Sequence, residues 1–174
     1  MATKLAANKR ILRPVERRNG AYVIQDNTQY LDFSTNDYLG MAQDSRLKNA
    51  VKDAVDHYGY GSTGSRLLSG DYALTHELEE DIATWQEKPC ALLFNSGFQM
   101  NAGILNALVD KETLIVADKR VHASLIDGAL ASDAKLIRYQ HNNINHLSEI
   151  MKKNRPFYKQ IVIITESLFS MDGD

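Results

Sequence analysis

The sequence has a single cysteine, no long apolar run and no excess of charge of one sign. Cys90 has no partner for an internal disulfide, which fits a reducing compartment. The longest aliphatic run, residues 161–164, is far too short to cross a bilayer. The first thirteen residues carry positive charge without the apolar stretch of a secretory signal. We therefore expect a cytoplasmic protein with no membrane partner.

Several common kinds of site are also missing. The formal charge is -2 and no polybasic block occurs, which argues against a nucleic-acid partner. No Cys/His cluster has zinc-ligand spacing, so we predict no metal site. The sequence contains no GxGxxG, no GxxxxGK[ST] and no GxSxG, so dinucleotide, P-loop and α/β-hydrolase functions have little support.

The first half of the chain reads as a small N-terminal segment followed by two helices. Alternating and helical spacings of apolar residues, with turn and capping residues between them, predict these elements. The expected elements are a hairpin over 21–33, a helix from Asp44 or Ser45 to the residue before Gly59, a glycine- and serine-rich loop over 59–70, and a helix over 74–85.

From residue 90 onward, short apolar runs alternate with helix-length amphipathic stretches. This alternation predicts an α/β fold with a mostly parallel sheet and helices on both faces. Residues 161–164 lack polar alternation, as in a strand covered on both faces. We expect an N-terminal segment over 1–43 and an incomplete larger domain over 44–174. The predicted strands are 91–94, 113–117, 135–139 and 160–165, and the predicted helices lie near 98–109, 123–131 and 146–153.

Small and polar residues follow each predicted strand, where open parallel sheets bind their ligands. Ser96 and Gly97 at a strand-to-helix turn fit a phosphate cradle, although a simple helix cap is the commoner reason for such a serine. His122 fits ring stacking or proton transfer, or a packed histidine at a helix start. Glu166 fits an orienting role or a strand cap, and Asp118 a helix-entry residue. The remaining polar residues at these ends are Asn95, His141, Asn142, Asn143, Ser167 and Ser170.

Seven segments, in this order and spacing, resemble one enzyme family. The α-oxoamine synthases are fold-type I pyridoxal-phosphate enzymes that condense an amino acid with an acyl thioester and release carbon dioxide. The resemblance covers nearly the whole chain. Any single motif is weak evidence for the family, but seven in matching order and spacing are specific for it. The segments are NDYLG (36–40), GSTGSRLLSG (61–70), H-x-LE (76–79), FNSGFQMNAG (94–103), D-x-x-x-H-AS-L-I-D-G (118–128), HNN (141–143) and ESLFSMDGD (166–174).

The resemblance implies roles for particular residues toward pyridoxal 5'-phosphate and the substrate. Phe98 stands where the family usually has tyrosine, which removes a hydroxyl but keeps the backbone N–H. The implied phosphate cradle is Ser96, Gly97 and Phe98; the implied ring-stacking and catalytic histidine is His122; Glu166 is a second catalytic residue; Ser170 lies near the phenolic oxygen; Asn36 faces the substrate; and Arg10, with Arg13 second, holds the substrate carboxylate.

The resemblance also implies substrates and partners. These are an amino acid, an acyl-CoA or acyl-carrier-protein thioester, and a second copy of the protein. The loop over 61–70 favours members that use alanine and a pimeloyl thioester over the glycine acetyltransferase, 5-aminolevulinate synthase and serine palmitoyltransferase types. None of the lysines has the context of the family's Schiff-base lysine, so we expect this chain alone to be inactive. A non-catalytic phosphate-binding fragment and a generic sheet for another phosphorylated ligand remain alternatives.

Overall fold

A computed structural model describes residues 11–174, and the chain divides into two compact units at Ala73 and Leu74. The domain boundary that we predicted between residues 43 and 44 stays a prediction. Among the described residues, no helix combines the length and the apolar character that crossing a membrane requires.

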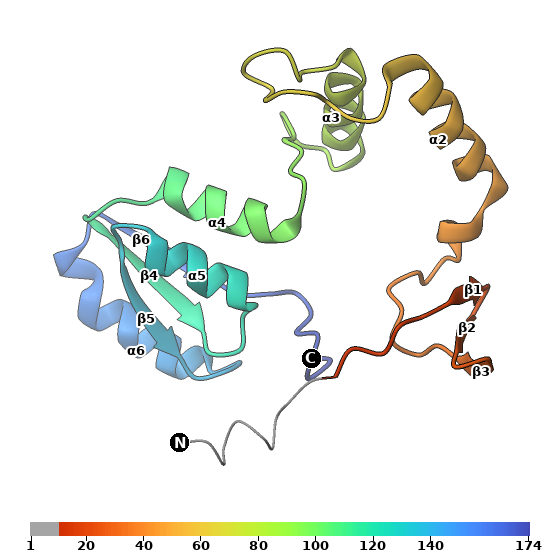
Figure 1. Cartoon of the computed structure of the whole chain (residues 1–174). Helices are drawn as coiled ribbons and strands as arrows, with labels where there is room; N and C mark the ends of the chain where they lie inside the picture. The colour runs from red at the N-terminus through yellow and green to blue at the C-terminus, as the bar shows by residue number, and fades with distance from the viewer. Residues whose placement is uncertain (1–10) are drawn as a thin grey trace. The chain divides into compact units, whose positions relative to one another are not determined.

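The N-terminal unit contains a small antiparallel sheet in the order β1-β2-β3 (Figure 1). Asp26 and Asn27 join β2 to β3 with positive φ angles of 49° and 57°, as a two-residue hairpin turn requires. The predicted hairpin is therefore confirmed, with β1 as an additional strand. The elements of this unit are β1 (Arg17–Asn19), β2 (Tyr22–Gln25), β3 (Thr28–Leu31), η1 (Met41–Gln43) and α2 (Ser45–Tyr58).

Helix α2 begins and ends at the predicted residues. Asp44 is the N-cap, and its side chain accepts a hydrogen bond from the Arg46 backbone N–H at 2.8 Å. Gly59 ends the helix with a φ of 80°. No residue of α2 is buried, and Val51 on its apolar face is 62% exposed.

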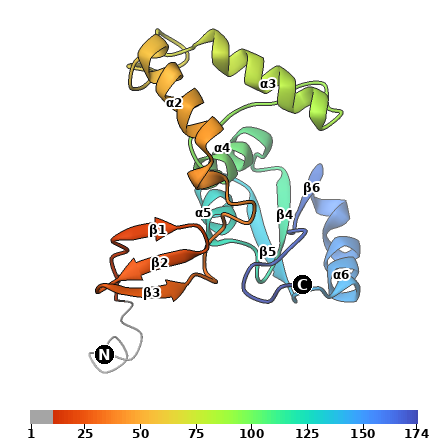
Figure 2. The same ribbon diagram turned by 90° about the vertical axis from the view of Figure 1, so that its right-hand side faces the viewer.

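The C-terminal unit holds a parallel sheet in the order β5-β4-β6, with helices on both faces (Figures 1 and 2). This arrangement confirms the predicted α/β fold class. The elements are α3 (Ala73–Trp85), α4 (Gly97–Leu108), β4 (Thr113–Asp118), α5 (Ala123–Ala131), β5 (Lys135–Tyr139), α6 (Ile144–Asn154), η2 (Arg155–Phe157) and β6 (Gln160–Ile164).

Strand β4 is the centre of the core, because all six of its residues are buried. Successive side chains of a strand point to opposite faces of the sheet. Ile115 and Ala117 pack with residues of α4 and α5, whereas Leu114 and Val116 pack with Tyr139 and residues of α6. The strand thus holds the helices of both faces in place and fixes where its own carboxyl end lies.

One strand prediction was wrong. Residues 91–94 form no strand, because the Leu93 N–H donates to the Glu79 carboxylate at 2.7 Å and no strand of the described residues lies beside them. Residues 161–164 form a strand, as predicted, and residues on both of its faces pack against the core, Val162 and Ile164 on one face and Ile161 on the other. Strand β6 pairs only with β4 within the described chain, and Ile163 is 46% exposed.

Candidate functional site

Three of the predicted site residues line one cavity in the C-terminal unit. His122 precedes α5, whereas Glu166 and Ser170 follow β6, and together they line a cavity of about 200 Å³. The cavity lies beyond the carboxyl ends of β4 and β6, where parallel sheets bind their ligands. Six further residues, which no sequence motif singled out for this cavity, complete its lining: Arg120, Val121, Ala123, Phe169, Met171 and Asp172.

Glu166 connects the end of β6 to the start of α5. Its carboxylate accepts a hydrogen bond from the backbone N–H of His122. The side chain of His122 is itself the N-cap of α5, since Nδ1 accepts the Ser124 backbone N–H at 3.2 Å. Both the main chain and the ring of His122 are therefore held in place beside the cavity.

The turn before α4 has the features of an anion site. Ser96 is the N-cap, and its Oγ accepts the Gln99 backbone N–H at 3.2 Å. Within residues 11–174, the N–H groups of Gly97 and Phe98 have no hydrogen-bond partner. A Cβ atom built on Gly97 would meet nothing within 4 Å, so the approach to these donors is open. Free N–H groups at a helix start, together with the helix dipole, favour a bound anion.

Ser96 and Gly97 also line a cavity of about 220 Å³. Its other lining residues are apolar: Leu92, Leu93, Phe94 and Met100. Phe98 is half exposed and leaves its ring available to a ligand beside the turn. The donors of the turn are thus reachable from outside the protein.

A buried carboxylate organises the loops that follow β4 and β5. The Asp118 side chain is fully buried, accepts the backbone N–H groups of Arg120 and Asn142, and contacts His141 Nδ1 at 2.9 Å. Burial alone raises the pKa of Asp118, but these hydrogen bonds outweigh it and hold the pKa below the ordinary value. Asp118 is thus a structural centre and more than the helix-entry residue that we expected.

His141 extends this network to the last loop of the chain. Its Nε2 lies 3.1 Å from the Asp174 carboxylate, and its ring packs edge-on against Phe169 with centroids 4.6 Å apart. The hydrogen bond to Asp118 raises the pKa of His141, burial opposes this effect, and Asp174 raises it further. The network holds the loop that carries Ser170 against the ends of β4 and β5.

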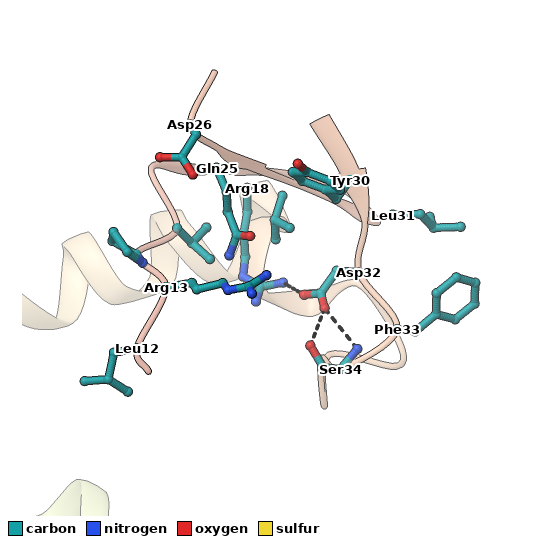
Figure 3. Close-up of a pocket in the computed structure, with 13 residues that line it drawn as sticks. Leu12, Arg13, Arg18, Gln25, Asp26, Tyr30, Leu31, Asp32, Phe33 and Ser34 are labelled. Atoms are coloured by element: carbon teal, nitrogen blue, oxygen red, sulfur yellow. Dashed lines mark hydrogen bonds and ion pairs between the residues drawn. The ribbon is translucent and has the colours of Figure 1, made fainter. Parts of the chain in front are cut away.

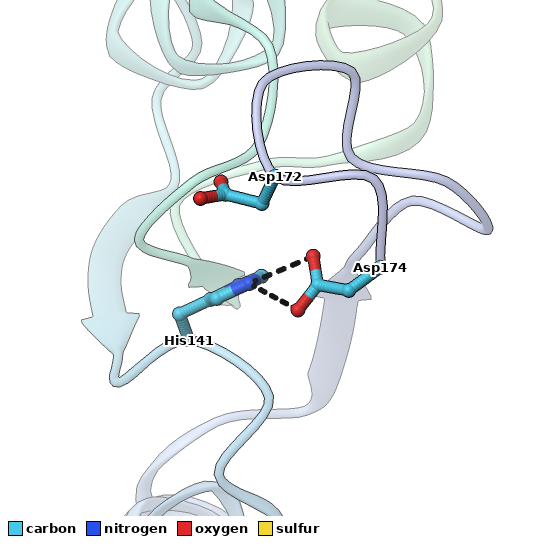
Figure 4. A group of neighbouring side chains, drawn as sticks. All are labelled: His141, Asp172 and Asp174. Carbon is cyan, nitrogen blue, oxygen red and sulfur yellow. Dashed lines mark hydrogen bonds and ion pairs between the residues drawn. The ribbon is translucent and has the colours of Figure 1, made fainter.

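His141, Asp172 and Asp174 form a group that the sequence did not suggest as metal ligands (Figure 4). Their possible ligand atoms lie within 4.8 Å of one another. Each side chain is already engaged, however, since Asp172 pairs with Arg120 and both ring nitrogens of His141 have carboxylate partners. Hydrogen bonds and ion pairs account for this group, and we assign no metal to it.

The N-terminal unit has a cavity of its own, of about 660 Å³ (Figure 3). Arg18 pairs there with Asp32 at 2.6 Å, and Asp32 also accepts the hydroxyl and backbone N–H of Ser34. The bonds from Ser34 and Arg18 lower the pKa of Asp32. Arg13, our second choice for the substrate carboxylate, lines this cavity and pairs with no described residue.

Two further residues that we predicted to bind the substrate are not placed at a cavity by the structure. Arg10, our first choice for the substrate carboxylate, lies outside the described residues. Asn36 lies in the N-terminal unit, where its side chain accepts the Tyr38 hydroxyl at 3.4 Å. Both assignments stay predictions.

This combination of a parallel sheet, an open helix start and polar residues at the strand ends defines a known class of protein. The chain belongs to the aminotransferase class I and II family, whose model matches residues 28–174.

Particular relatives agree with this class. The chain is 46% identical over 166 residues to an 8-amino-7-oxononanoate synthase of Haemophilus ducreyi, covering 92% of this chain and 43% of the relative. It is 35% identical to a solved 8-amino-7-oxononanoate synthase of Francisella tularensis, with a TM-score of 0.62, covering 82% of this chain and 38% of that one. It is 25% identical to a serine palmitoyltransferase of S. paucimobilis solved with bound PLP and myriocin, with a TM-score of 0.91, covering 99% and 44%.

These relatives confirm the resemblance to the α-oxoamine synthases that the motifs indicated. The chain spans less than half the length of the curated relatives it matches.

Proposed function

We propose that this chain is part of a pyridoxal-phosphate-dependent acyltransferase. The reaction condenses L-alanine with a pimeloyl thioester of CoA or acyl carrier protein, releases carbon dioxide and gives 8-amino-7-oxononanoate, a step in biotin synthesis. The observation that carries the proposal is the grouping of His122, Glu166 and Ser170 around one cavity at the carboxyl edge of the sheet. The identity to 8-amino-7-oxononanoate synthases supports this choice of substrates.

The residues present fit the phosphate group of the proposed cofactor. The unpartnered N–H groups of Gly97 and Phe98 are open to an anion at the start of α4, and Ser96 adds a hydroxyl. We assign the phosphate to this turn, with Ser170 toward the phenolic oxygen. When bound, pyridoxal phosphate supplies an electron sink for a carbanion at the amino acid's α-carbon.

The proposed roles of His122 and Glu166 follow from their contacts. His122 offers the flat face of its ring to the cofactor, in a position set by its cap of α5. Glu166 holds the His122 backbone through the N–H that it accepts, so it keeps the ring beside the cavity. Arg10 or Arg13 would bind the substrate carboxylate, and Asn36 would contact the substrate.

A serine palmitoyltransferase type is the second candidate. The solved enzyme of this type matches the fold with a TM-score of 0.91, although its identity is only 25%. The two candidates differ in their substrates and are separated by direct assay.

The test uses the protein as its source genome encodes it, with any sequence beyond residue 174, hereafter the encoded protein. It is assayed for carbon dioxide release with alanine plus pimeloyl-CoA, glycine plus acetyl-CoA, and serine plus palmitoyl-CoA. We expect turnover with the first pair, and turnover with only another pair would overturn the substrate assignment. Thermal shifts with pyridoxal phosphate but not with nucleotides would exclude a generic phosphate-binding sheet.

We further propose a cytoplasmic homodimer in which the loop over 59–70 lies near the partner. This loop is folded on itself, since the Gly70 N–H donates to the Ser65 carbonyl at 3.0 Å, yet Leu67 is 94% exposed and Leu68 84% exposed. Exposed apolar side chains on an ordered loop are suited to an interface. We expect Leu68→Glu to weaken the dimer in sedimentation velocity, and a wild-type encoded protein that is monomeric at micromolar concentration would contradict the proposal.

A further inference from the structure

The imidazole of His122 is held through one nitrogen, Nδ1. The Ser124 backbone N–H donates to this nitrogen at 3.2 Å, and the Ser124 Oγ lies 2.7 Å from it. A backbone N–H can only donate, so Nδ1 has to present a lone pair. In a neutral imidazole, the ring proton then resides on Nε2.

The hydroxyl of Ser124, like its backbone N–H, is oriented to donate to Nδ1 of His122. Its Oγ accepts a hydrogen bond from the Asn101 side-chain NH₂ at 2.9 Å, and an NH₂ group can only donate. The single proton of the hydroxyl is then free to point at His122 Nδ1. Ser124 is fully buried, so water does not reach its hydroxyl. Two donors thus converge on Nδ1.

Close packing of two helices lets Asn101 reach Ser124. Helices α4 and α5 pack side by side in Figures 1 and 2. A Cβ atom at Gly128 would lie 2.9 Å from the Ala102 Cα and 3.0 Å from the Asn101 carbonyl oxygen, so only glycine permits this approach. Asn101 lies one helical turn, about 6 Å, beyond Gly97. The contact therefore joins α4, whose first turn is the candidate anion site, to His122 at the cavity.

We propose that Asn101 and Ser124 are positioning residues that set the tautomer of His122, with the ring proton on Nε2. Among residues 11–174, Nε2 of His122 has no partner, and His122 lines the cavity. Nε2 is thus kept as a hydrogen-bond donor for a ligand bound there. The identity of that ligand rests on the proposed function, whereas the tautomer follows from the contacts themselves.

The tautomer is measured directly by ¹⁵N NMR of the encoded protein labelled at histidine, with the His122 signals assigned by their loss in His122→Gln. We expect a protonated Nε2 and an unprotonated Nδ1 for His122 in the wild type, both without and with pyridoxal phosphate. A proton on Nδ1 in the wild type would overturn the proposal, whether or not any variant folds.

Two variants then separate a positioning role from a merely structural one. Asn101→Asp is nearly isosteric, but its carboxylate accepts the Ser124 hydroxyl proton and takes it away from His122. Only the Ser124 backbone N–H then still donates to Nδ1, so we expect a partial shift of population toward the Nδ1-protonated form. Ser124→Thr keeps the hydroxyl and should retain the wild-type tautomer. Ser132→Ala is the matched control, because this serine is the C-cap of the same helix and bonds only the Ala129 carbonyl and the Ala134 N–H, away from His122.

The outcomes are distinct from those of the acyltransferase assay. A His122 tautomer that is unchanged in folded Asn101→Asp, or changed equally in Ser132→Ala, would refute the positioning role. An encoded protein with the expected tautomer but no turnover of any substrate pair would refute the proposed function and leave this inference in place.

Discussion

At the residue scale, two helix caps have similar geometry, but only one of them lies at the candidate anion site before α4. Ser96 caps α4 and Asn143 caps α6, each accepting the N–H three residues on, from Gln99 and His146. Only the first cap belongs to the proposed phosphate site. The pair therefore separates the effect of a lost cap from the effect of a lost ligand contact.

We predict that Ser96→Ala and Asn143→Ala each lower the free energy of unfolding of the encoded protein by about 1 kcal/mol, because each removes one cap. Only Ser96→Ala should also weaken pyridoxal-phosphate binding, by about 10-fold or more, since a hydrogen bond to a charged group is worth about 1.5–3 kcal/mol. Denaturant unfolding and absorbance titration measure the two effects. Equal cofactor affinity in the two variants would argue against a phosphate at Ser96.

His141 gives a second prediction at this scale, in the dependence of stability on pH. Its pKa is raised above the ordinary 6.5, chiefly by Asp118, so its contribution is complete below 6.5 and is lost as the pH rises through the raised value. The pKa of Asp118 is lowered from 3.8, so its contribution is present above 3.8 and is lost as the pH falls through the lowered value.

We therefore expect the melting temperature of the encoded protein to fall more between about pH 6 and about pH 9 than that of His141→Gln. His57→Gln, in the N-terminal unit and outside this network, should follow the wild type. Parallel curves for the wild type and His141→Gln would show that the imidazole does not gain stability from the two carboxylates.

At the element scale, the strands of the parallel sheet differ in burial. Leu114 of β4 is 0% exposed, whereas Ile163 of β6 is 46% exposed. We predict that Leu114→Ala lowers the free energy of unfolding by roughly 2–5 kcal/mol, through lost burial and the cavity left behind. Ile163→Ala should cost clearly less. Urea unfolding of both variants of the encoded protein tests this order, and equal losses would mean that another part of that protein covers β6.

The element scale is also where local sequence patterns were most informative. Hydrophobic spacing and caps predicted α2 from Asp44 to Gly59, and the alternation from residue 90 onward predicted β4, α5 and β5. The apolar run at residues 91–94, by contrast, forms no strand. An apolar run becomes a strand only when a neighbouring strand takes its backbone groups, and at Leu93 the Glu79 side chain takes the N–H instead.

At the scale of the whole molecule, the cavities around the candidate site contain no lysine among the described residues. Lys119 follows β4 but is exposed, and Lys135 begins β5, at the sheet edge opposite to the cavity. Formation of a resting Schiff base requires a lysine amine.

We predict that the 174-residue chain, incubated with pyridoxal phosphate and reduced with borohydride, gives no stoichiometric adduct on a single lysine and does not turn over alanine with an acyl thioester. Peptide mapping by mass spectrometry makes the measurement, with the encoded protein treated in parallel. One dominant adduct in the 174-residue chain, accompanied by turnover, would place the active site within these residues.

The sequence by itself determined the class of fold, most element boundaries and three of the residues around the cavity, His122, Glu166 and Ser170. These depend on short-range spacing, on capping chemistry and on motifs such as ESLFSMDGD, all of which are local in the chain.

Only the tertiary structure decided which side chains meet. Asp118 bonds His141 across 23 positions, His141 bonds Asp174 across 33, and Asn101 bonds Ser124 across 23. Such contacts depend on strand order and on the close approach of two helices at Gly128, and no periodicity along the chain encodes either. The same is true of β4 as the buried centre, because a strand becomes central only when neighbours pair with both of its edges.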